Sequence, residues 1–331
     1  LLIASGRGTA RIGGADTEHV SVERTYICPP ESSNESSSAT QAATSSGGQT
    51  VQGQTNSTQQ TGGANATQSK REEIRVRVPY IPGSSLKGRI RSLLEVALGL
   101  PLYSSDGKIW AHTPAPKANK ALRASEQREA EDENKLSFNE VINIIKGTDL
   151  DRLFGFPALH LDDVAKNAPG KLNDLLAVLT PTPLLIDDFF PDKEYVCKIY
   201  NENGIVTFDD FLEEKNENRI DRITSAADPR TVLRVKPGVK FIGNISILVY
   251  DKNADKLKDF LTLLAKGMKL LEATYLGASG SRGYGRVKFA EIKATYYNPT
   301  TMKETQAVTF NSVDDMANRV DEIISLVGVS K

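Results

Sequence analysis

The sequence of 331 residues lacks several features that mark common protein classes. It has two cysteines, Cys28 and Cys197, which match no zinc-ligand or CxxC spacing. This usage favours a reducing, cytoplasmic compartment, and we expect both thiols to be unreactive. No stretch approaches the roughly 18 apolar residues of a membrane span, so we expect no membrane partner. The first residues contain neither a starting methionine nor a long apolar run, which predicts no secretory signal and a missing true N-terminus.

An excess of positive charge is also lacking. The net charge is −1, whereas generic nucleic-acid binders usually have a strongly basic domain. Any contact with nucleic acid must therefore depend on cations clustered on particular elements. The composition, 39% hydrophobic and 25% charged, is that of an ordinary globular protein with one large domain or two.

Two polar stretches interrupt the chain. Residues 31–69 are nearly all Ser, Thr, Gln, Asn, Gly and Ala, and ordering them would cost backbone entropy without burying apolar surface. We predict a disordered insertion here. Residues 116–135 are highly charged, and we predict a second insertion that forms either a loop or a fraying, solvated helix.

Between the insertions, hydrophobic periodicity predicts alternating strands and helices. Strands are expected over Arg75–Ile81, Lys240–Tyr250 and Gly285–Tyr297, and helices over Ser84–Leu98 and Asp255–Glu272. Strand, helix, strand, helix, strand with antiparallel connections is the pattern of the ferredoxin-like α+β sheet. RNA-recognition domains use this sheet.

A first candidate site is the segment IPGSSLKGRIR, which ends at Arg91. Ser84 or Ser85 can cap the predicted helix, and the free N–H groups of its first turn form a natural phosphate site. Lys87 lies four residues before Arg91 and so shares its face, with Arg89 as a third cation. A nucleotide-binding P-loop is excluded because Arg89 stands where the phosphate lysine should be. An ordinary capped helix with surface cations is an equally good interpretation of these residues.

A second candidate site is the segment GASGSRGYGR, which ends at Arg286. It lies between a predicted helix and a strand, whereas the glycines of a dinucleotide-binding fold follow a strand and precede a helix. Glycines let the backbone approach a ligand, and exposed N–H groups beside a cation suit a phosphodiester backbone. The candidate contacts are Gly277, Gly280, Ser281, Arg282 and Gly283. The alternative is a glycine-rich turn that closes the last helix onto the last strand.

These two segments, in this order, resemble the RAMP superfamily of CRISPR effector proteins, and within it the Csm-type backbone subunits of type III-A complexes. Two further segments carry the resemblance: RLFG, ending at Gly155, and NRIDRITSAADPR, ending at Arg230. The resemblance covers residues 1–24 and most of 75–297. It implies a ferredoxin-like (RRM-like) RAMP core over residues 1–30 and 70–300, interrupted by the insertions, with a thumb-like region over 185–238 and a C-terminal extension over 301–331.

The resemblance also implies a function. Such a subunit multimerises along a CRISPR RNA, beside other type III effector subunits, and cleaves complementary target RNA at regular intervals. A hairpin around residues 219–230 would interrupt the duplex of guide and target, which makes Arg222 and Arg230 candidate RNA contacts. A solvated, charged turn is the alternative for each of these residues taken singly.

The segment IGGAD, which ends at Asp16, resembles the glycine context of the family's target-cleaving aspartate. The resemblance predicts Asp16 as the catalytic residue, with a divalent cation such as Mg²⁺ as cofactor and no identifiable metal ligands. The proline-containing segment that follows in the family is missing here, and Leu2 stands where relatives often have a histidine. Taken without the family, Asp16 is a turn aspartate after two glycines.

Two other functions remain open for such a chain. One is a purely architectural RAMP subunit that binds guide RNA without cutting. The other is a guide-processing ribonuclease of the same superfamily, which often has a histidine in its centre. The three histidines His19, His112 and His160 share no motif, and this argues against the guide-processing ribonuclease.

Overall fold

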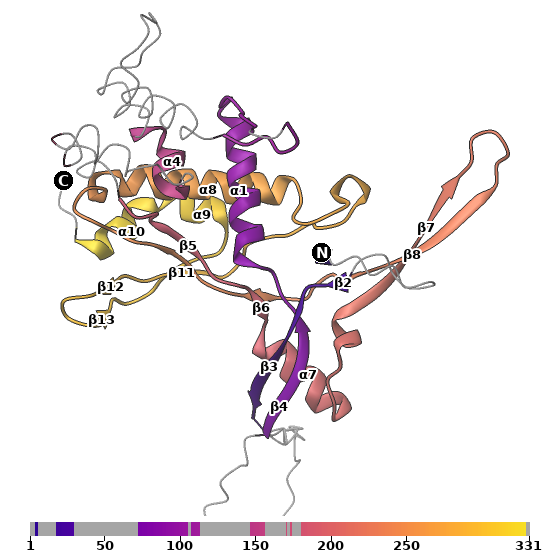
Figure 1. Cartoon of the computed structure of the whole chain (residues 1–331). Coiled ribbons are helices and arrows are strands. Elements are labelled where there is room, and N and C mark those ends of the chain that lie inside the picture. The colour runs from indigo at the N-terminus through magenta and orange to yellow at the C-terminus, as the bar shows by residue number, and fades with distance from the viewer. Residues whose placement is uncertain are drawn as a thin grey trace, which may run out of the picture.

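The computed structural model describes residues 4–5, 18–29, 72–104, 107–112, 146–155, 170, 173 and 180–328. Its mixture of helices and strands confirms the predicted α+β class (Figure 1). The helices are α1 Gly83–Ala97, α4 Asp149–Phe154, α7 Lys193–Asn203, α8 Leu257–Ala273, α9 Val313–Asn318 and α10 Val320–Val327. The predicted insertions over 31–69 and 116–135 lie outside the described residues.

The strands of the described ranges pair two by two, and every pair is antiparallel. The pairs are β1 Ala4–Ser5 with β2 Glu18–His19, β3 Ser21–Cys28 with β4 Glu72–Pro79, β5 Leu184–Ile186 with β10 Ile245–Ile247, β6 Phe190–Pro191 with β9 Phe241–Ile242, β7 Leu212–Ile220 with β8 Ala227–Val235, β11 Ile292–Ala294 with β14 Val308–Phe310, and β12 Tyr297–Asn298 with β13 Lys303–Glu304. The sequence predicted the order strand, helix, strand, helix, strand for the core. The structure has this order in β4, α1, the pair β9 and β10, α8 and β11.

Two of the predicted strands were too long. The stretch 240–250 contains the separate strands β9 and β10, which pair with β6 and β5 respectively. Gly243 lies between them, where a Cβ would lie 2.5 Å from Cδ2 of Phe189. The stretch 285–297 contains β11 and the start of β12, and Glu291 just before β11 has a positive φ of 54° that interrupts extended backbone. Val287 and Phe289 are nevertheless half-buried against the core, as the alternation predicted.

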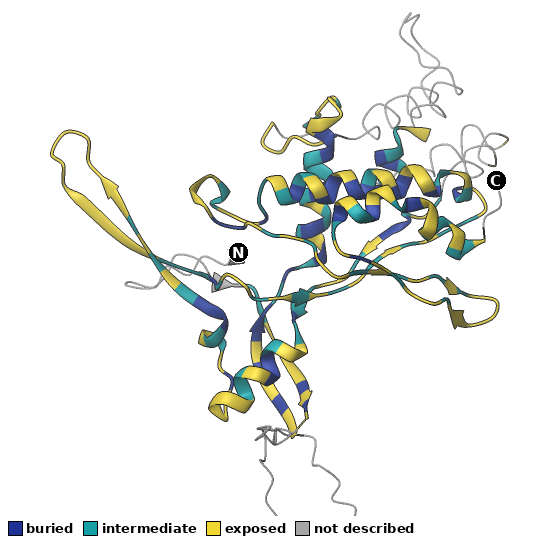
Figure 2. Ribbon diagram, turned by 180° about the vertical axis from the view of Figure 1, so that it is seen from behind, coloured by how far each residue is buried: buried dark blue, intermediate teal, exposed yellow. Residues whose placement is uncertain are grey.

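The main core lies where α1 crosses α8, and α4 and α9 pack beside them (Figure 2). Ile90 and Leu94 of α1 are fully buried there. Gly267 of α8 makes the close approach possible, since a Cβ at this position would lie 2.5 Å from Cγ2 of Ile90. Burial of each large apolar side chain stabilises the fold by about 1.5–3 kcal/mol, so this crossing fixes the position of α1.

The predicted C-terminal extension contributes to the same core. Phe310 at the end of β14 is fully buried, and Val313 and Met316 of α9 are buried beside it. The α10 residue Val320 packs against α8 in a smaller adjoining cluster. Residues 308–320 therefore supply part of the hydrophobic core.

A second core lies between the β3–β4 ladder and α7. Tyr26, Ile74 and Val196 are buried in it. Cys28 of β3 and Cys197 of α7 form a disulfide here, with a Cα–Cα distance of 5.3 Å. The expectation of two unreactive thiols was therefore wrong, and the cysteine usage no longer supports a reducing compartment. A separation of 169 residues in sequence gives no information on distance in the fold.

The hairpin of β7 and β8 extends away from both cores (Figures 1 and 2). Most of its side chains are exposed, and only Leu212 and Val235 at its base are buried. A hairpin is therefore present over the predicted stretch 219–230, and its thumb-like role stays a prediction. No helix in the described part of the chain is both long and apolar enough to span a bilayer.

Candidate RNA-binding surface

The first turn of α1 is arranged differently from the prediction. Pro82 is the N-cap residue, and neither Ser84 nor Ser85 caps the helix by its side chain, so that expectation was wrong. The N–H of Gly83 donates instead to Oδ1 of Asp188, at 2.8 Å. This donor is therefore not available to an incoming phosphate. The exposed Ser84 and the half-buried Ser85 stay predicted RNA contacts.

Gly83 is required by packing. A Cβ at this position would lie 2.1 Å from the carbonyl oxygen of Ile186, at the end of β5. The helix can therefore start against β5 only if its first residue is glycine. The glycine of the IPGSS segment positions α1, and no ligand is needed to explain it.

Two cations of α1 have backbone partners inside the protein. Nζ of Lys87 donates to the carbonyl of Leu184 at 2.8 Å, and burial, followed by the charge of Arg91, lowers the pKa of this lysine. Nε of Arg89 donates to the carbonyl of Tyr275 at 3.0 Å, and its guanidinium lies 4.3 Å from the centre of the Tyr275 ring. Both side chains join α1 to neighbouring elements.

Arg91 is the centre of a largely buried polar network. Its guanidinium donates to Glu95 at 2.8 Å and to Asp151 of α4 at 3.2 Å, and both carboxylates are almost completely buried. It also donates to the carbonyls of Gly155 and His112. This cation thus compensates two buried carboxylates. RNA binding by Arg91 stays a prediction, while the geometry gives it a structural role.

Asp151 and the RLFG segment that follows it supply part of this network. Asp151 also contacts Nε2 of His112 at 3.2 Å and accepts from the hydroxyl of Thr148 at 3.3 Å. Gly155 has a φ of 84°, which favours glycine, and its carbonyl faces Arg91. The segment thus closes α4 onto α1.

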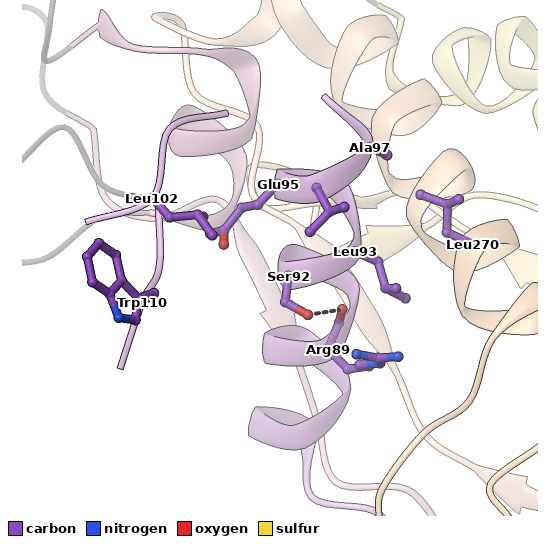
Figure 3. Close-up of a pocket in the computed structure, with 9 residues that line it drawn as sticks. Arg89, Ser92, Leu93, Glu95, Ala97, Leu102, Trp110 and Leu270 are labelled. Carbon is purple, nitrogen blue, oxygen red and sulfur yellow. Dashed lines mark hydrogen bonds between the residues drawn. The ribbon is translucent and has the colours of Figure 1, made fainter. Parts of the chain in front are cut away.

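An open cavity of about 320 Å³ lies beside the C-terminal half of α1. Its lining is mostly apolar, and Figure 3 shows Trp110 and Leu102 on one side of the helix. The guanidinium of Arg89 points to the other side, where Leu270 of α8 lies (Figure 3). Arg89 is one of the residues that line the cavity, but no other candidate residue lines it. The cavity therefore does not join Arg89 to the other candidate residues.

The glycine-rich segment folds into a compact loop between α8 and β11, with a 3-10 turn, η3, over Gly280–Arg282. A Cβ on Gly280 would lie 1.9 Å from Cγ of Tyr275, and one on Gly285 would lie 2.0 Å from the carbonyl of Leu276. Internal packing explains these two glycines. Gly283 differs, since its φ is 83° and nothing in the described structure lies within 4 Å of the place a Cβ would take. The space beside its Cα is therefore open, although its N–H donates to the carbonyl of Gly280 at 3.2 Å and is not free for a phosphate.

The loop and the hairpin meet at Glu217 in the middle of β7. Oε1 of Glu217 accepts a hydrogen bond of 2.6 Å from Tyr284, and Oε2 accepts one of 2.7 Å from Arg230 on β8. Arg282 of the loop lies 3.9 Å from the same Oε2. The structure therefore brings together two residues, Arg230 and Arg282, that were predicted from separate segments.

Lys215 makes a further contact between the hairpin and the loop. Its Nζ donates to the carbonyl of Arg282 at 3.0 Å and lies 4.3 Å from the centre of the Tyr284 ring. Lys215, Arg230 and Arg282 together carry three positive charges beside the single negative charge of Glu217. The cluster has two excess positive charges, which suits an anionic ligand.

The hydrogen bonds at this cluster fix its protonation states. The bonds from Tyr284 and from Arg230 hold the pKa of the Glu217 carboxyl below its usual value. Burial, and then the hydrogen bond to Glu217, raise the pKa of the Tyr284 phenol. At neutral pH the carboxylate is therefore charged and the phenol remains a donor.

The sequence did not identify Lys215, Glu217 or Tyr284. Lys215 and Glu217 lie in the alternating run LEEKNENRI, which has the composition of a solvated strand. Arg222, which was predicted, lies exposed near the tip of the hairpin. The neighbouring turn is closed by Asp221, which accepts from the backbone N–H groups of Ile223 and Thr224.

The predicted catalytic residue, Asp16, lies outside the described residues. Across the ranges that the structure describes, no group of three or more His, Cys, Asp or Glu side chains could hold a metal ion. The remaining predicted loop residues, Gly277 and Ser281, are exposed.

Comparison with known proteins adds an independent result. The sequence model of the RAMP superfamily matches residues 11–288. Three relatives each carry the name CRISPR system Cms endoribonuclease Csm3. The protein from Methanothermobacter thermautotrophicus is 34% identical over 66% of this chain and 69% of its own. The protein from Methanocaldococcus jannaschii is 30% identical over 73% of this chain and 77% of its own. The protein from Mycobacterium tuberculosis is 31% identical over 66% of this chain and 72% of its own.

A solved structure is also similar. The crystal structure of Csm3 from Methanopyrus kandleri aligns with 75% of this chain and 85% of its own, with a TM-score of 0.38. The two sequences are 18% identical.

Proposed function

The chain belongs to the RAMP superfamily, and on this basis we propose that it is a guide-RNA-binding backbone subunit of a type III CRISPR interference complex. It multimerises along the CRISPR RNA and cleaves complementary target RNA at regular intervals. The observation that carries the proposal is the set of relatives named Csm3 endoribonuclease, which this chain matches over two thirds or more of their length.

The cation cluster supports the RNA-binding part of the proposal. The chain as a whole has a net charge of −1, yet Lys215, Arg230 and Arg282 surround one carboxylate at the junction of the hairpin and the glycine-rich loop. Backbone N–H groups and arginines bind RNA through its phosphates and so do not select its sequence. A subunit that covers successive segments of a guide needs this kind of contact. The proposed location is the cytoplasm, together with other type III effector subunits.

The proposed catalytic residue is Asp16. An aspartate with an ordinary pKa of about 3.9 is a weak base at neutral pH, so we assign its carboxylate an orienting or metal-binding role. A bound divalent cation such as Mg²⁺ would supply electrostatic stabilisation of the phosphate. The target's own 2′-hydroxyl, aligned by a flipped-out nucleotide, attacks the adjacent phosphorus, and the P–O5′ bond breaks so that the next nucleotide leaves with a 5′-hydroxyl. The expected product has a 2′,3′-cyclic phosphate.

The test begins with the purified full chain, which should co-isolate with CRISPR-repeat RNA as a multimer. Asp16→Ala should then abolish cutting of guide-paired RNA and leave assembly, guide retention and target binding unchanged. Asp228→Asn, which removes one exposed carboxylate from the hairpin, is the matched control and should cut normally. If Asp16→Ala still cuts at the same spaced positions, the catalytic assignment is wrong. If neither the wild type nor the control cuts but both retain guide RNA, the architectural alternative holds.

A further inference from the structure

The contact between the hairpin and the glycine-rich loop rests on one carboxylate. Glu217 accepts from Tyr284 of the loop by one oxygen and from Arg230 of β8 by the other. The Glu217 side chain is only 13% exposed, and Tyr284 is fully buried. A carboxylate that bridges two elements in this way defines their relative orientation, because both of its oxygens are used.

The two arginines at this junction are themselves well exposed. The side chains of Arg230 and Arg282 are 49% and 51% exposed, although each lies within 4 Å of Glu217. Arg282 is further restrained by its donation to Ser279 at 2.6 Å. Each guanidinium thus contacts the protein while about half of its side chain stays exposed to solvent. This arrangement leaves donors available to a phosphate while the side chain is held in place.

We infer that Glu217 is a positioning residue, which orients Arg230 and Arg282 so that the hairpin and the glycine-rich loop bind consecutive phosphates of the RNA strand as one surface. The inference rests on the proposed function, because it names the residue that organises its guide-binding site. Glu217 itself does not contact RNA in this arrangement. It acts through the two arginines and through Tyr284, whose hydroxyl fixes the loop.

A positioning role and net charge alone predict opposite changes in RNA affinity when the charge of Glu217 is removed. Removal of a negative charge near an RNA site should strengthen binding if only the net charge matters. If Glu217 positions the arginines, its neutralisation should weaken binding, because both guanidinium groups lose the anchor that restricts their rotamers. The direction of the change therefore separates the two accounts.

The experiment compares Glu217→Gln with Asp228→Asn in the full chain, with a labelled single-stranded RNA of mixed sequence as the probe. Both substitutions remove one carboxylate from the hairpin, but Asp228 pairs with the exposed Arg219, at 3.0 Å, rather than with the cation cluster. We expect Glu217→Gln to weaken binding about tenfold, the effect of one charge-assisted hydrogen bond. The slope of log affinity against log salt should become shallower by about 0.7 for each phosphate that the variant no longer binds. Asp228→Asn should bind as tightly as the wild type or more tightly.

A second set of variants excludes a merely structural effect. In a background of Arg230→Ala and Arg282→Ala, Glu217→Gln should change the affinity by less than about twofold, because the residues it acts through are gone. A tenfold loss in this background would overturn the positioning role. If Glu217→Gln does not fold, Tyr284→Phe removes the loop anchor and keeps the ring, and it should weaken binding in the same direction.

The outcomes distinguish the inference from the proposed function. If the wild type binds RNA and Glu217→Gln binds equally or more tightly, the inference is overturned and the function stands. If the wild type does not bind single-stranded RNA, the proposed function fails, and the inference fails with it.

Discussion

The backbone N–H of Gly83 donates a hydrogen bond of 2.8 Å to the carboxylate of Asp188, which lies 105 residues later in the chain. A carboxylate at a helix N-terminus satisfies one unpaired donor and interacts favourably with the helix dipole. It also occupies the place that an RNA phosphate would take. The start of α1 is thus stabilised from within the protein.

We therefore expect Asp188→Ala to lower the free energy of unfolding by about 1 kcal/mol, as for the loss of an N-cap. Asp188→Asn keeps an acceptor and should lose less. RNA affinity per folded molecule should not fall in either variant, since a competing negative charge is removed. Denaturant unfolding and RNA titration check this. A fall in RNA affinity at unchanged stability would show that Asp188 has another role.

The Arg91 network predicts a large loss of stability. Arg91→Ala would leave the buried carboxylates of Glu95 and Asp151 without their shared cation, and such a change costs about 3–5 kcal/mol. Arg222→Ala, at the exposed hairpin tip, is the control and should change stability by no more than about 0.5 kcal/mol. Unfolding in urea measures both. If Arg91→Ala is as stable as the wild type but retains less guide RNA, the phosphate-binding interpretation is correct.

Two glycines of the loop should respond differently to alanine. Gly280→Ala places a Cβ onto the ring of Tyr275, so thermal stability and RNA affinity should both fall. Gly283→Ala meets no neighbour and costs about 1–2 kcal/mol of backbone strain from its positive φ. Its main effect should be on RNA affinity, because the added methyl group would occupy the open space where we propose that the RNA backbone binds. Thermal melts with RNA titrations separate the two, and equal affinity of Gly283→Ala and wild type would contradict ligand contact there.

The Cys28–Cys197 disulfide should stabilise the second core. Because it closes a loop of 169 residues, its reduction is expected to lower the free energy of unfolding by about 2–5 kcal/mol. Unfolding with and without dithiothreitol measures this difference. The double variant Cys28→Ser, Cys197→Ser should be insensitive to the reductant. Two titratable thiols in the native protein under non-reducing conditions would contradict the assignment.

Tyr26 predicts a loss of stability at high pH. Burial, as the largest cause, raises the pKa of its phenol to about 12, whereas an unfolded tyrosine has a pKa of about 10. The unfolded state therefore loses its proton first, and stability falls as the pH rises through this window. Tyr26→Phe removes the hydrogen bond to the carbonyl of Pro191. It also removes the titrating phenol, so the variant lacks this pH dependence. The advantage of the wild type over Tyr26→Phe should shrink from pH 9 to pH 12, and a constant difference would contradict the shift.

Helical periodicity predicted the parts of this fold that depend on local sequence. The two longest helices, α1 and α8, begin and end within two residues of the predicted bounds, because their apolar residues repeat along one face and bury it. The short strands were predicted less well. Their ends depend on pairing with strands far away in the sequence, such as β9 with β6 and β10 with β5, which no local pattern contains.

The candidate site shows the same limit. Glycine and arginine motifs selected two separate segments, and the structure brings Arg230 and Arg282 from them to one carboxylate. The partners of Arg91 could not be foreseen, because Asp151 lies 60 residues away and its burial depends on how α4 packs. Glu217 was missed for a similar reason. A glutamate in a strand of alternating charges has no local signal that distinguishes it from a solvated residue.

The hairpin of β7 and β8 is joined to the glycine-rich loop at Glu217 and is exposed beyond it. About five residues separate this junction from the tip, and at about 3.3 Å per residue they form an arm of roughly 17 Å. A tilt of about 10° at Glu217 would displace the tip by roughly 3 Å, the length of a hydrogen bond. A small change in orientation at the junction therefore becomes a displacement of the tip that is as large as a hydrogen bond. If the tip contacts RNA as proposed, the geometry at Glu217 determines how accurately it is placed.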